Sequence, residues 1–188
     1  MVTTKKGKKL NQKTPLNENL LFDFFKKHKI KYCLFEHQPV FTVNEKPIVT
    51  AMDGVATSEP IPEPHFKTLF LKDQNGKFFL VSVFQEKRVD LNALNVALEC
   101  GRFSFGKAEE LLDFLQLTPG SVTPYGLLFD HQNKVQFVLD EDALINPWVS
   151  FHPMRNDMTV VTTLPDFLKC MKNMKHKARV LRIPEKKA

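Results

Sequence analysis

Apolar side chains recur at helical spacing in several stretches of this 188-residue chain. The first such stretch begins near Asn17, a residue type that is favoured at helix caps. Its apolar face comprises Leu20, Leu21, Phe24 and Phe25. Further helices are predicted over 50–56, 91–98, 108–115 and 165–172, with Asp90 as the expected cap of the 91–98 helix.

Short apolar runs between these helices predict strands. Residues 68–71 and 78–83 flank the turn sequence 72–76, in which Asn75-Gly76 is typical of a hairpin. Further strands are predicted over 32–35, 135–139, 148–151, 158–162 and 179–183. Because strands and helices interleave and one hairpin is local, we expect an α/β fold, with a single domain formed by a mixed, mostly antiparallel sheet and surrounding helices.

Basic residues are concentrated at the start of the chain. Residues 1–15 contain five lysines and almost nothing apolar, which predicts a disordered basic arm, with the folded domain over 16–188. The arm could contact a phosphate backbone, or it could be a solubilising tail. The net charge of +6 favours polyanions such as RNA, although a solvated lysine-rich surface gives the same value.

The composition and the missing motifs exclude several classes of protein. With 43% hydrophobic residues the chain can form a sizeable core, but it has no apolar run near the roughly 20 residues that span a bilayer. No apolar segment follows the N-terminal lysines, so we expect no signal peptide, no membrane contact and a cytoplasmic location. The three cysteines and six histidines lack metal-ligand spacing, and no phosphate-binding glycine loop or nucleophile elbow occurs. We therefore expect neither a metal nor a cofactor.

Two local patterns could supply a cation or backbone donors to a substrate. Lys67 precedes an apolar strand, where a lysine can face a cleft and bind an anion or a carbonyl, although strand ends often carry ordinary surface lysines. The sequence from Gly120 to Gly126 includes Pro124 and forms a stiff turn that can aim N–H groups at one point, as an oxyanion hole does. A plain connecting loop would look the same.

Two histidines stand at the ends of predicted strands. His152 could bind a ligand hydroxyl or amine, although a histidine at a strand end is more often a structural hydrogen-bond donor. His37 precedes an apolar stretch that includes Phe41, and both could line a pocket or pack in the core. Each of the four patterns is weak alone.

In their order along the chain, the four patterns resemble the YbaK/ProX family of aminoacyl-tRNA editing domains, and most closely the alanyl-tRNA(Pro) deacylases called ProXp-ala or PrdX. These are related to the editing insertion of bacterial prolyl-tRNA synthetase. The resemblance covers about residues 17–183 and is specific because its segments keep their order and spacing. The segments are 36–43, 65–73, 88–91, 118–126 and 151–153, followed by Asn156 and Thr159.

The resemblance implies a metal-free hydrolase that removes a wrongly attached amino acid from tRNA(Pro). Lys67 is then expected to contact the substrate near its terminal nucleotide, Gly120 to begin the loop that cradles the aminoacyl ester, and His152 to shape the pocket. The family usually has Asn directly after the lysine, where this chain has the shorter, branched Thr68. The implied substrate-binding residues are His37, Phe41, Thr68, Ser121, Val122, Thr123, Pro124 and Asn156.

The expected substrate is Ala-tRNA(Pro), hydrolysed in trans by a monomer that could also associate with prolyl-tRNA synthetase. A Cys- or Ser-specific deacylase is the nearer alternative. The Cys-specific branch tends to have a Gly-x-Ser-Pro-type loop, whereas here Thr123 precedes Pro124. A non-catalytic module that holds tRNA for a synthetase is the more distant alternative. Lys67 together with the intact Gly120 loop favours the enzyme, because a binding module would not need both.

Overall fold

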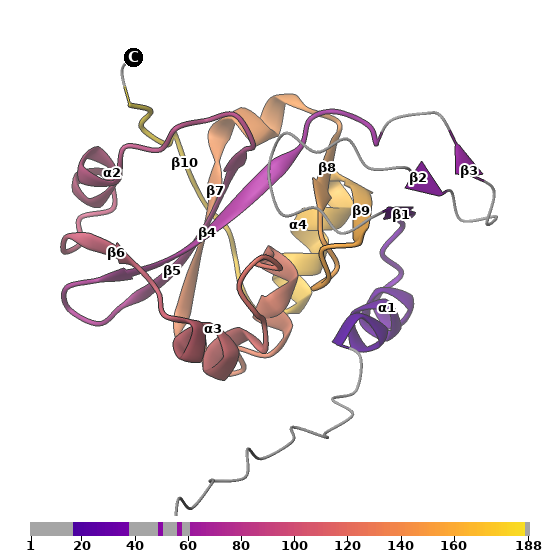
Figure 1. The fold of residues 1–188 in the computed structure, drawn as a ribbon, viewed down its shortest axis with the longest axis horizontal. Coiled ribbons are helices and arrows are strands. Elements are labelled where there is room, and N and C mark those ends of the chain that lie inside the picture. The colour runs from indigo at the N-terminus through magenta and orange to yellow at the C-terminus, as the bar shows by residue number, and fades with distance from the viewer. Residues whose placement is uncertain (1–16, 38–48, 51–55, 58–60, 187–188) are drawn as a thin grey trace, which may run out of the picture.

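The strands form two five-stranded sheets in a computed structural model, which describes residues 17–37, 49–50, 56–57 and 61–186 (Figure 1). Sheet A has the strand order β3-β2-β1-β9-β8, and every neighbouring pair in it is antiparallel. Strands β1 and β8 therefore run in the same direction on either side of β9. The strands of sheet A are β1 (Cys33–His37), β2 (Val49–Thr50), β3 (Ala56–Thr57), β8 (Trp148–Phe151) and β9 (Met158–Thr163).

Sheet B combines both strand directions, in the order β10-β7-β5-β4-β6. Strand β4 is antiparallel to β5 and β6, whereas β7 is parallel to β5 and β10. The expected α/β class with mixed, mostly antiparallel strands is confirmed, and the strands divide between two sheets. The strands of sheet B are β4 (Phe66–Asp73), β5 (Phe78–Phe84), β6 (Phe103–Phe105), β7 (Val135–Asp140) and β10 (Arg179–Leu181).

Strand β5 occupies the centre of sheet B because its side chains are apolar on both faces. Phe78 and Leu80 belong to the larger core, which also contains side chains of sheet A, whereas Phe79 and Val81 belong to a smaller core. Successive side chains of a strand point to opposite faces, so the two cores lie on opposite faces of sheet B. A strand buried on both faces appears in the sequence as a continuous apolar run.

Helices cover both cores. The larger core contains side chains of α1, α3, α4 and η1, and the smaller core contains side chains of α2 and the segment after it. The helices are α1 (Asn17–His28), α2 (Leu91–Ala97), α3 (Ala108–Leu115) and α4 (Leu164–Asn173), with the 3-10 helices η1 (Pro124–Leu128) and η2 (Glu141–Ile145).

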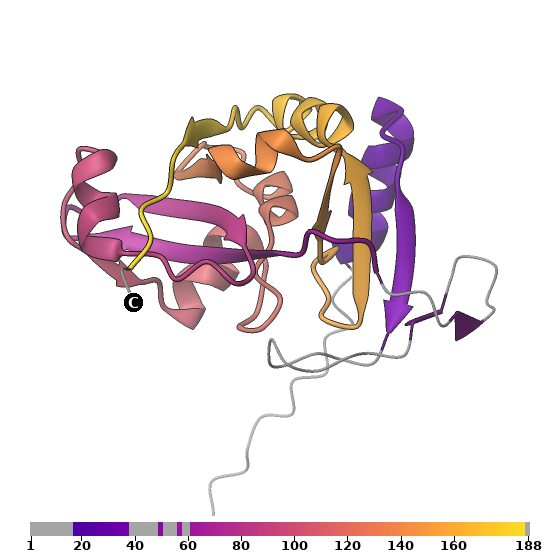
Figure 2. The same cartoon turned by 90° about the horizontal axis from the view of Figure 1, so that it is seen from above.

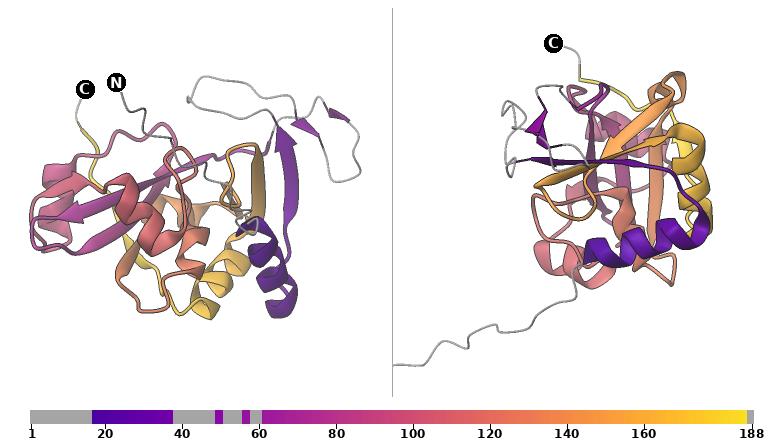
Figure 3. Two further views of the ribbon diagram at one scale, coloured as in Figure 1. Left: turned by 60° about the horizontal axis from the view of Figure 1, so that its bottom comes forward. Right: turned by 90° about the vertical axis from the view of Figure 1, so that its right-hand side faces the viewer.

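The two sheets cross each other, as Figure 2 shows, and sheet A has two distinct ends. Helices α1 and α4 are in contact, and the C-terminal end of α1 lies at one end of sheet A (Figure 3). The C-terminal end of β1 points to the other end. The last residue of β1 is therefore remote from the C-terminal end of α1.

Several predicted elements are confirmed. Helix α3 and strand β8 have the predicted bounds, and the β4–β5 hairpin turns at Gly76, whose φ is +80°. Asp90 caps α2 because its carboxylate accepts hydrogen bonds from the N–H groups of Asn92 and Ala93, at 2.9 and 3.1 Å. Alternation, turn chemistry and capping thus predict these elements locally.

Other predictions are wrong or lie outside the described residues. Asn17 is inside α1, and its amide donates to the Gln116 carbonyl at 2.7 Å instead of capping the helix. The helix predicted over 50–56 is wrong at both ends, because Thr50 belongs to β2 and Ala56 to β3. Residues 51–55 and the predicted arm, residues 1–15, lie outside the described part. Elements β6 and η2 were not predicted, since such short elements show no clear period.

Candidate active site

Two histidines expected at the site meet at one end of sheet A. His37 is the last residue of β1, and His152 directly follows the last residue of β8. These two strands flank β9 and run in the same direction, so their C-terminal ends lie at the same end of sheet A. The two imidazole centroids lie 5.8 Å apart. The sheet therefore joins residues that are far apart in the sequence.

The backbone holds His152 in one tautomer. Its Nδ1 lies 2.6 Å from the carbonyl oxygen of Met158, the first residue of β9. Because a carbonyl oxygen only accepts, Nδ1 carries the proton and Nε2 of the neutral ring is an acceptor. Burial lowers the pKa of His152, and the nearby His37 adds to this shift, although the hydrogen bond to Met158 opposes it. A neutral His152 can accept a hydrogen bond from an amine, a hydroxyl or a water molecule.

His37 is buried and is positioned by the start of β9, the strand that also holds His152. Its Nε2 lies 3.0 Å from the hydroxyl of Thr159, the second residue of β9. Its backbone N–H donates to the Asp157 carbonyl at 2.9 Å. The first two residues of β9 therefore each hold one histidine ring, and Asp157 holds the backbone of His37.

A charged network holds the turn between His152 and β9. Arg155 donates from Nε and Nη2 to the two carboxylate oxygens of Asp157, at 2.9 and 2.6 Å, and from Nη1 to Glu18 at 2.7 Å. Glu18 lies in the first turn of α1 and is only 5% exposed. The hydrogen bonds from Arg155 lower the pKa of Asp157. These three residues, here called the arginine clamp, tie the turn that follows His152 to helix α1.

We expect Arg155→Ala to lower the free energy of unfolding by about 2 kcal/mol, because it leaves the buried Glu18 carboxylate without this donor. Arg182→Ala is the matched control. Arg182 approaches Glu141 only to 3.7 Å and its side chain is 84% exposed, so its loss should cost less than about 0.5 kcal/mol. Urea unfolding followed by circular dichroism measures both, and equal stabilities would contradict a stabilising clamp.

The glycine loop, defined as residues 118–124, has the backbone shape of a glycine turn. Gly120 has a φ of +90°, and a Cβ placed on it would meet no atom within 4 Å. Positive φ, not a close approach within the protein, therefore accounts for glycine at this position. Ser121, Thr123 and Pro124 are buried, and Val122 packs half-buried on the larger core.

The hydroxyls of the glycine loop bind the loop or the start of η1, but several backbone N–H groups of the loop have no acceptor. Ser121 Oγ donates to the Thr118 carbonyl at 2.9 Å, and Thr123 Oγ1 accepts from an N–H in the first turn of η1 at 3.4 Å. Within the described part of the chain, the N–H groups of Gly120, Val122 and Thr123 have no hydrogen-bond acceptor. Such donors are what an oxyanion hole requires.

The ring of Phe151 brings the three expected catalytic segments together. Its centroid lies 5.3 Å from that of Phe66, which precedes Lys67, and 6.2 Å from that of Tyr125, which follows the glycine loop. Phe151 itself precedes His152. Strand β4, the glycine loop and the end of β8 therefore pack around one buried aromatic side chain.

Lys67 and Thr68 leave β4 on opposite faces, because successive side chains of a strand alternate. Thr68 Oγ1 lies 2.9 Å from the Ser82 hydroxyl across the β4–β5 pair. Burial lowers the pKa of Lys67, although the nearby Glu86 and Glu185 oppose this shift. In the ranges that the structure describes, no hydrogen bond or ion pair joins Lys67 to the two histidines. Phe66 and Lys67 also point to opposite faces, so the Lys67 side chain leaves β4 on the face opposite to the Phe66–Phe151 contact, near Glu86 and Glu185.

The structure describes Asn156 but not Phe41, the last two residues expected at the site. Asn156 is half-buried in the turn that the arginine clamp holds, in the segment that joins His152 to β9. Phe41 lies outside the described residues, so its place in the pocket stays a prediction. Of the residues with a described placement, no group of three or more His, Cys, Asp or Glu could hold a metal ion. None of the described helices is long and apolar enough to cross a membrane.

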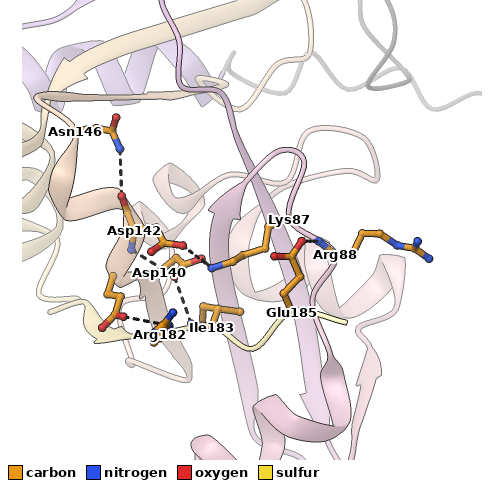
Figure 4. A network of polar contacts seen from close by, with 9 residues as sticks. Lys87, Arg88, Asp140, Asp142, Asn146, Arg182, Ile183 and Glu185 are labelled. Atoms are coloured by element: carbon orange, nitrogen blue, oxygen red, sulfur yellow. Dashed lines mark hydrogen bonds and ion pairs between the residues drawn. The ribbon is translucent and has the colours of Figure 1, made fainter. Parts of the chain in front are cut away.

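A second candidate site is a hollow beside the C-terminal segment, and its charges are already paired. Lys87 donates to Asp140 at 2.6 Å and to Asp142 at 2.7 Å (Figure 4). Burial disfavours the charged form of Lys87, but the two carboxylates outweigh burial and raise its pKa. The Ile183 N–H also donates to Asp140 at 3.3 Å, which fastens the C-terminal segment to the end of β7, so we do not assign the hollow a ligand. The hollow measures about 410 Å³ and is lined by Lys87, Asp142, Arg182, Ile183, Pro184 and Glu185.

Comparisons with known proteins identify the family. The sequence profile of the aminoacyl-tRNA editing domain matches residues 45–170. Prolyl-tRNA editing protein ProX of Acetoanaerobium sticklandii is 33% identical over 147 residues, which cover 77% of this chain and 84% of that protein. Prolyl-tRNA synthetase associated domain-containing protein 1 of Danio rerio is 32% identical, over 86% of this chain and 84% of its own. The chain therefore belongs to the aminoacyl-tRNA editing domain family.

A solved structure supports the same fold. It is described as a candidate trans-editing enzyme for prolyl tRNA synthetase, and it aligns with a TM-score of 0.62 over 93% of this chain and 100% of its own. At 17% identity, this likeness concerns the fold alone. The family match confirms the YbaK/ProX-type relationship expected from the sequence.

Proposed function

We propose that this protein is a trans-acting deacylase that hydrolyses misacylated tRNA(Pro), with Ala-tRNA(Pro) as its preferred substrate. The observation that supports this most is the neutral His152. Its Nε2 is an acceptor at the end of sheet A where the glycine loop and β4 also pack. The relative in Acetoanaerobium sticklandii is named a prolyl-tRNA editing protein. The name of the Danio rerio relative agrees with prolyl-tRNA synthetase as a partner.

The proposed chemistry is the addition of water to the ester that joins the amino acid to the terminal adenosine. Attack on the carbonyl carbon places negative charge on its oxygen, which the N–H groups of Gly120, Val122 and Thr123 can stabilise. When the ester C–O bond breaks, one proton of the water passes to the ribose oxygen and the amino acid leaves as its free acid. His152 Nε2 accepts from the substrate amine, a ribose hydroxyl or the water. No side-chain nucleophile is needed.

Selection of alanine would depend on the size and shape of the pocket. One methylene group changes binding by only about 1–3 kcal/mol, so proline must also be rejected by the shape of its ring. Backbone of the glycine loop and the rigid rings of His37 and His152 would provide walls that admit a small side chain. Because proline would be too bulky for this pocket, the correctly aminoacylated Pro-tRNA(Pro) would escape hydrolysis.

Single-turnover hydrolysis of tRNA(Pro) charged with Ala, Ser, Cys or Pro tests the proposal. We expect Ala to be removed much faster than Pro, and an alanyl ester on an unrelated RNA to be a poor substrate. Fastest removal of Cys or Ser would assign the protein to another specificity. The feature of this chain that favours such an outcome is Thr68, which replaces the usual Asn. No hydrolysis of any substrate would favour the alternative, a non-catalytic tRNA-binding module.

Lys67 is proposed to contact the substrate near its terminal nucleotide. Lys67→Ala should therefore lower the deacylation rate at least tenfold, about the contribution of one charge-assisted contact, with little change in melting temperature. Lys77→Ala is the control, because Lys77 is an exposed lysine in the β4–β5 turn of the same sheet. If both variants keep the normal rate, Lys67 is an ordinary strand-end lysine and leaves the site.

A further inference from the structure

Eight exposed lysines lie on α1 and α4, two helices in contact with each other, and in the residues that follow these helices. They stand at the C-terminal end of α1 and along α4 and the residues after it, and all of them are exposed. Lys169 Nζ donates to the Lys29 carbonyl at 3.1 Å, so the segment that follows α1 lies beside α4 (Figure 3). This group, here called the lysine ridge, consists of Lys26, Lys27, Lys29, Lys31, Lys169, Lys172, Lys175 and Lys177.

Acidic side chains do not neutralise the lysine ridge. No lysine of the ridge forms an ion pair with another described residue. Over residues 17–31 and 164–177 the acidic side chains are Glu18, Asp23 and Asp166, and the arginine clamp already uses Glu18. Like charges at helical neighbours, as at Lys169 and Lys172, repel each other. A regular array of negative charges would remove this repulsion.

The ridge is a local excess of charge and does not reflect an overall basic domain. Residues 1–15 contain five of the 27 basic residues and no acidic one, so 22 basic and 21 acidic residues remain in 16–188. The rest of the domain is correspondingly acidic, as at Glu109, Glu110 and Asp113 of α3. The fold thus separates charge in space.

We propose that the lysine ridge binds the phosphate backbone of RNA, at a distance from the site where the ester is cut; the identity of this RNA as tRNA(Pro) rests on the proposed function. Flexible lysines act as point charges suited to successive phosphates. Membrane binding would need an apolar face beside the charges, but the apolar side of α4, with Phe167, Cys170 and Met171, is buried.

The position of the ridge predicts which part of the RNA it contacts. Lys31 lies just before β1 and His37 ends it, a separation of about 20 Å at roughly 3.4 Å per residue. The phosphates bound by the ridge should therefore belong to the base-paired body of the tRNA when its 3′ end is at the histidines. The ridge would add affinity without taking part in hydrolysis.

The test compares two triple variants of the full chain with the same change in charge. The ridge variant is Lys27→Gln, Lys172→Gln and Lys175→Gln. The control variant is Lys77→Gln, Arg102→Gln and Lys134→Gln, which removes three exposed cations next to the hairpin end of sheet B. Affinity for uncharged tRNA(Pro) is measured by fluorescence anisotropy over a series of salt concentrations.

We expect the ridge variant to bind tRNA(Pro) at least tenfold more weakly at low salt and to reduce the slope of log K against log salt by about 3, or roughly one for each lost phosphate contact. The control variant should keep both values, and the ridge variant should keep the normal single-turnover rate at saturating protein. Equal losses in both variants, or an unchanged slope, would overturn the proposal. So would ridge-dependent binding to phosphatidylserine vesicles with unaltered tRNA binding. Ridge-dependent tRNA binding without any deacylation would reject the proposed function alone.

Discussion

Gly120→Ala is expected to lower single-turnover deacylation about 100-fold while the protein stays folded. The φ of +90° at Gly120 suits glycine, and alanine would shift the backbone of the loop to a negative φ or retain it under strain of about 1 kcal/mol. The shift to a negative φ, which relieves this strain, displaces the N–H groups of Gly120 and Val122. The loss of one oxyanion donor lowers turnover by about 10²- to 10³-fold in other hydrolases.

Gly76→Ala separates the loss of chemistry from simple backbone strain. Gly76 also has a positive φ, +80°, and a Cβ there would likewise meet no atom within 4 Å. It lies in the β4–β5 hairpin, outside the proposed site. Both variants should lose similar stability in thermal unfolding, but only Gly120→Ala should lose activity. Normal turnover by a folded Gly120→Ala protein would make the glycine loop a structural connection.

His152→Ala should also lower deacylation about 100-fold, the typical contribution of a positioned acid–base group. Two further substitutions distinguish the roles of the two ring nitrogens. Asparagine can still donate to the Met158 carbonyl but offers nothing in place of Nε2, whereas glutamine can place an acceptor near the Nε2 position. We expect His152→Asn to be stable and inactive, and His152→Gln to recover part of the rate. Full activity of His152→Asn would reduce His152 to a structural donor.

The lowered pKa of His152 gives this site a defined pH dependence. The neutral ring persists below the usual value of about 6.5, so the rate should stay constant down to that pH and fall in more acidic solution as Nε2 gains a proton. The folded state binds this proton more weakly than the unfolded state. The same titration therefore removes stability as the pH falls from about 6.5 towards the lowered pKa. Rates and urea unfolding measured between pH 4.5 and 8 check both effects.

Local signals in the sequence predict most single elements but not how they assemble. The period of α3 and the alternation of β8 depend on neighbouring residues, so their bounds could be predicted. The division into two sheets depends on which strands pair, and pairs such as β1 with β9 join distant parts of the chain. Because side chains alternate along a strand, the sequence already places Lys67 and Thr68 on opposite faces, although the resemblance assigns both residues to one site.

The arginine clamp shows why part of the site escaped prediction. An acidic residue such as Glu18 in the first turn of a helix normally complements the helix dipole, so nothing in its sequence context indicates a distant partner. Arg155 and Asp157 carry opposite charges in a turn that follows a histidine, and this pattern is common in surface turns. Their role follows only from the fold, which brings the start of α1 to the turn after His152. The histidines, by contrast, stand at predicted strand ends and could be found from the sequence.

The clamp also links heat inactivation to a small part of the molecule. Helix α1 has 12 residues, and among the described contacts its fully buried apolar side chains are Leu21 and Phe25. A helix of this length is marginal by itself, so its local unfolding should require less free energy than opening either sheet. When α1 detaches, Arg155 loses Glu18 and the turn after His152 loosens. We therefore expect activity to disappear on warming while most of the native sheet structure is still intact.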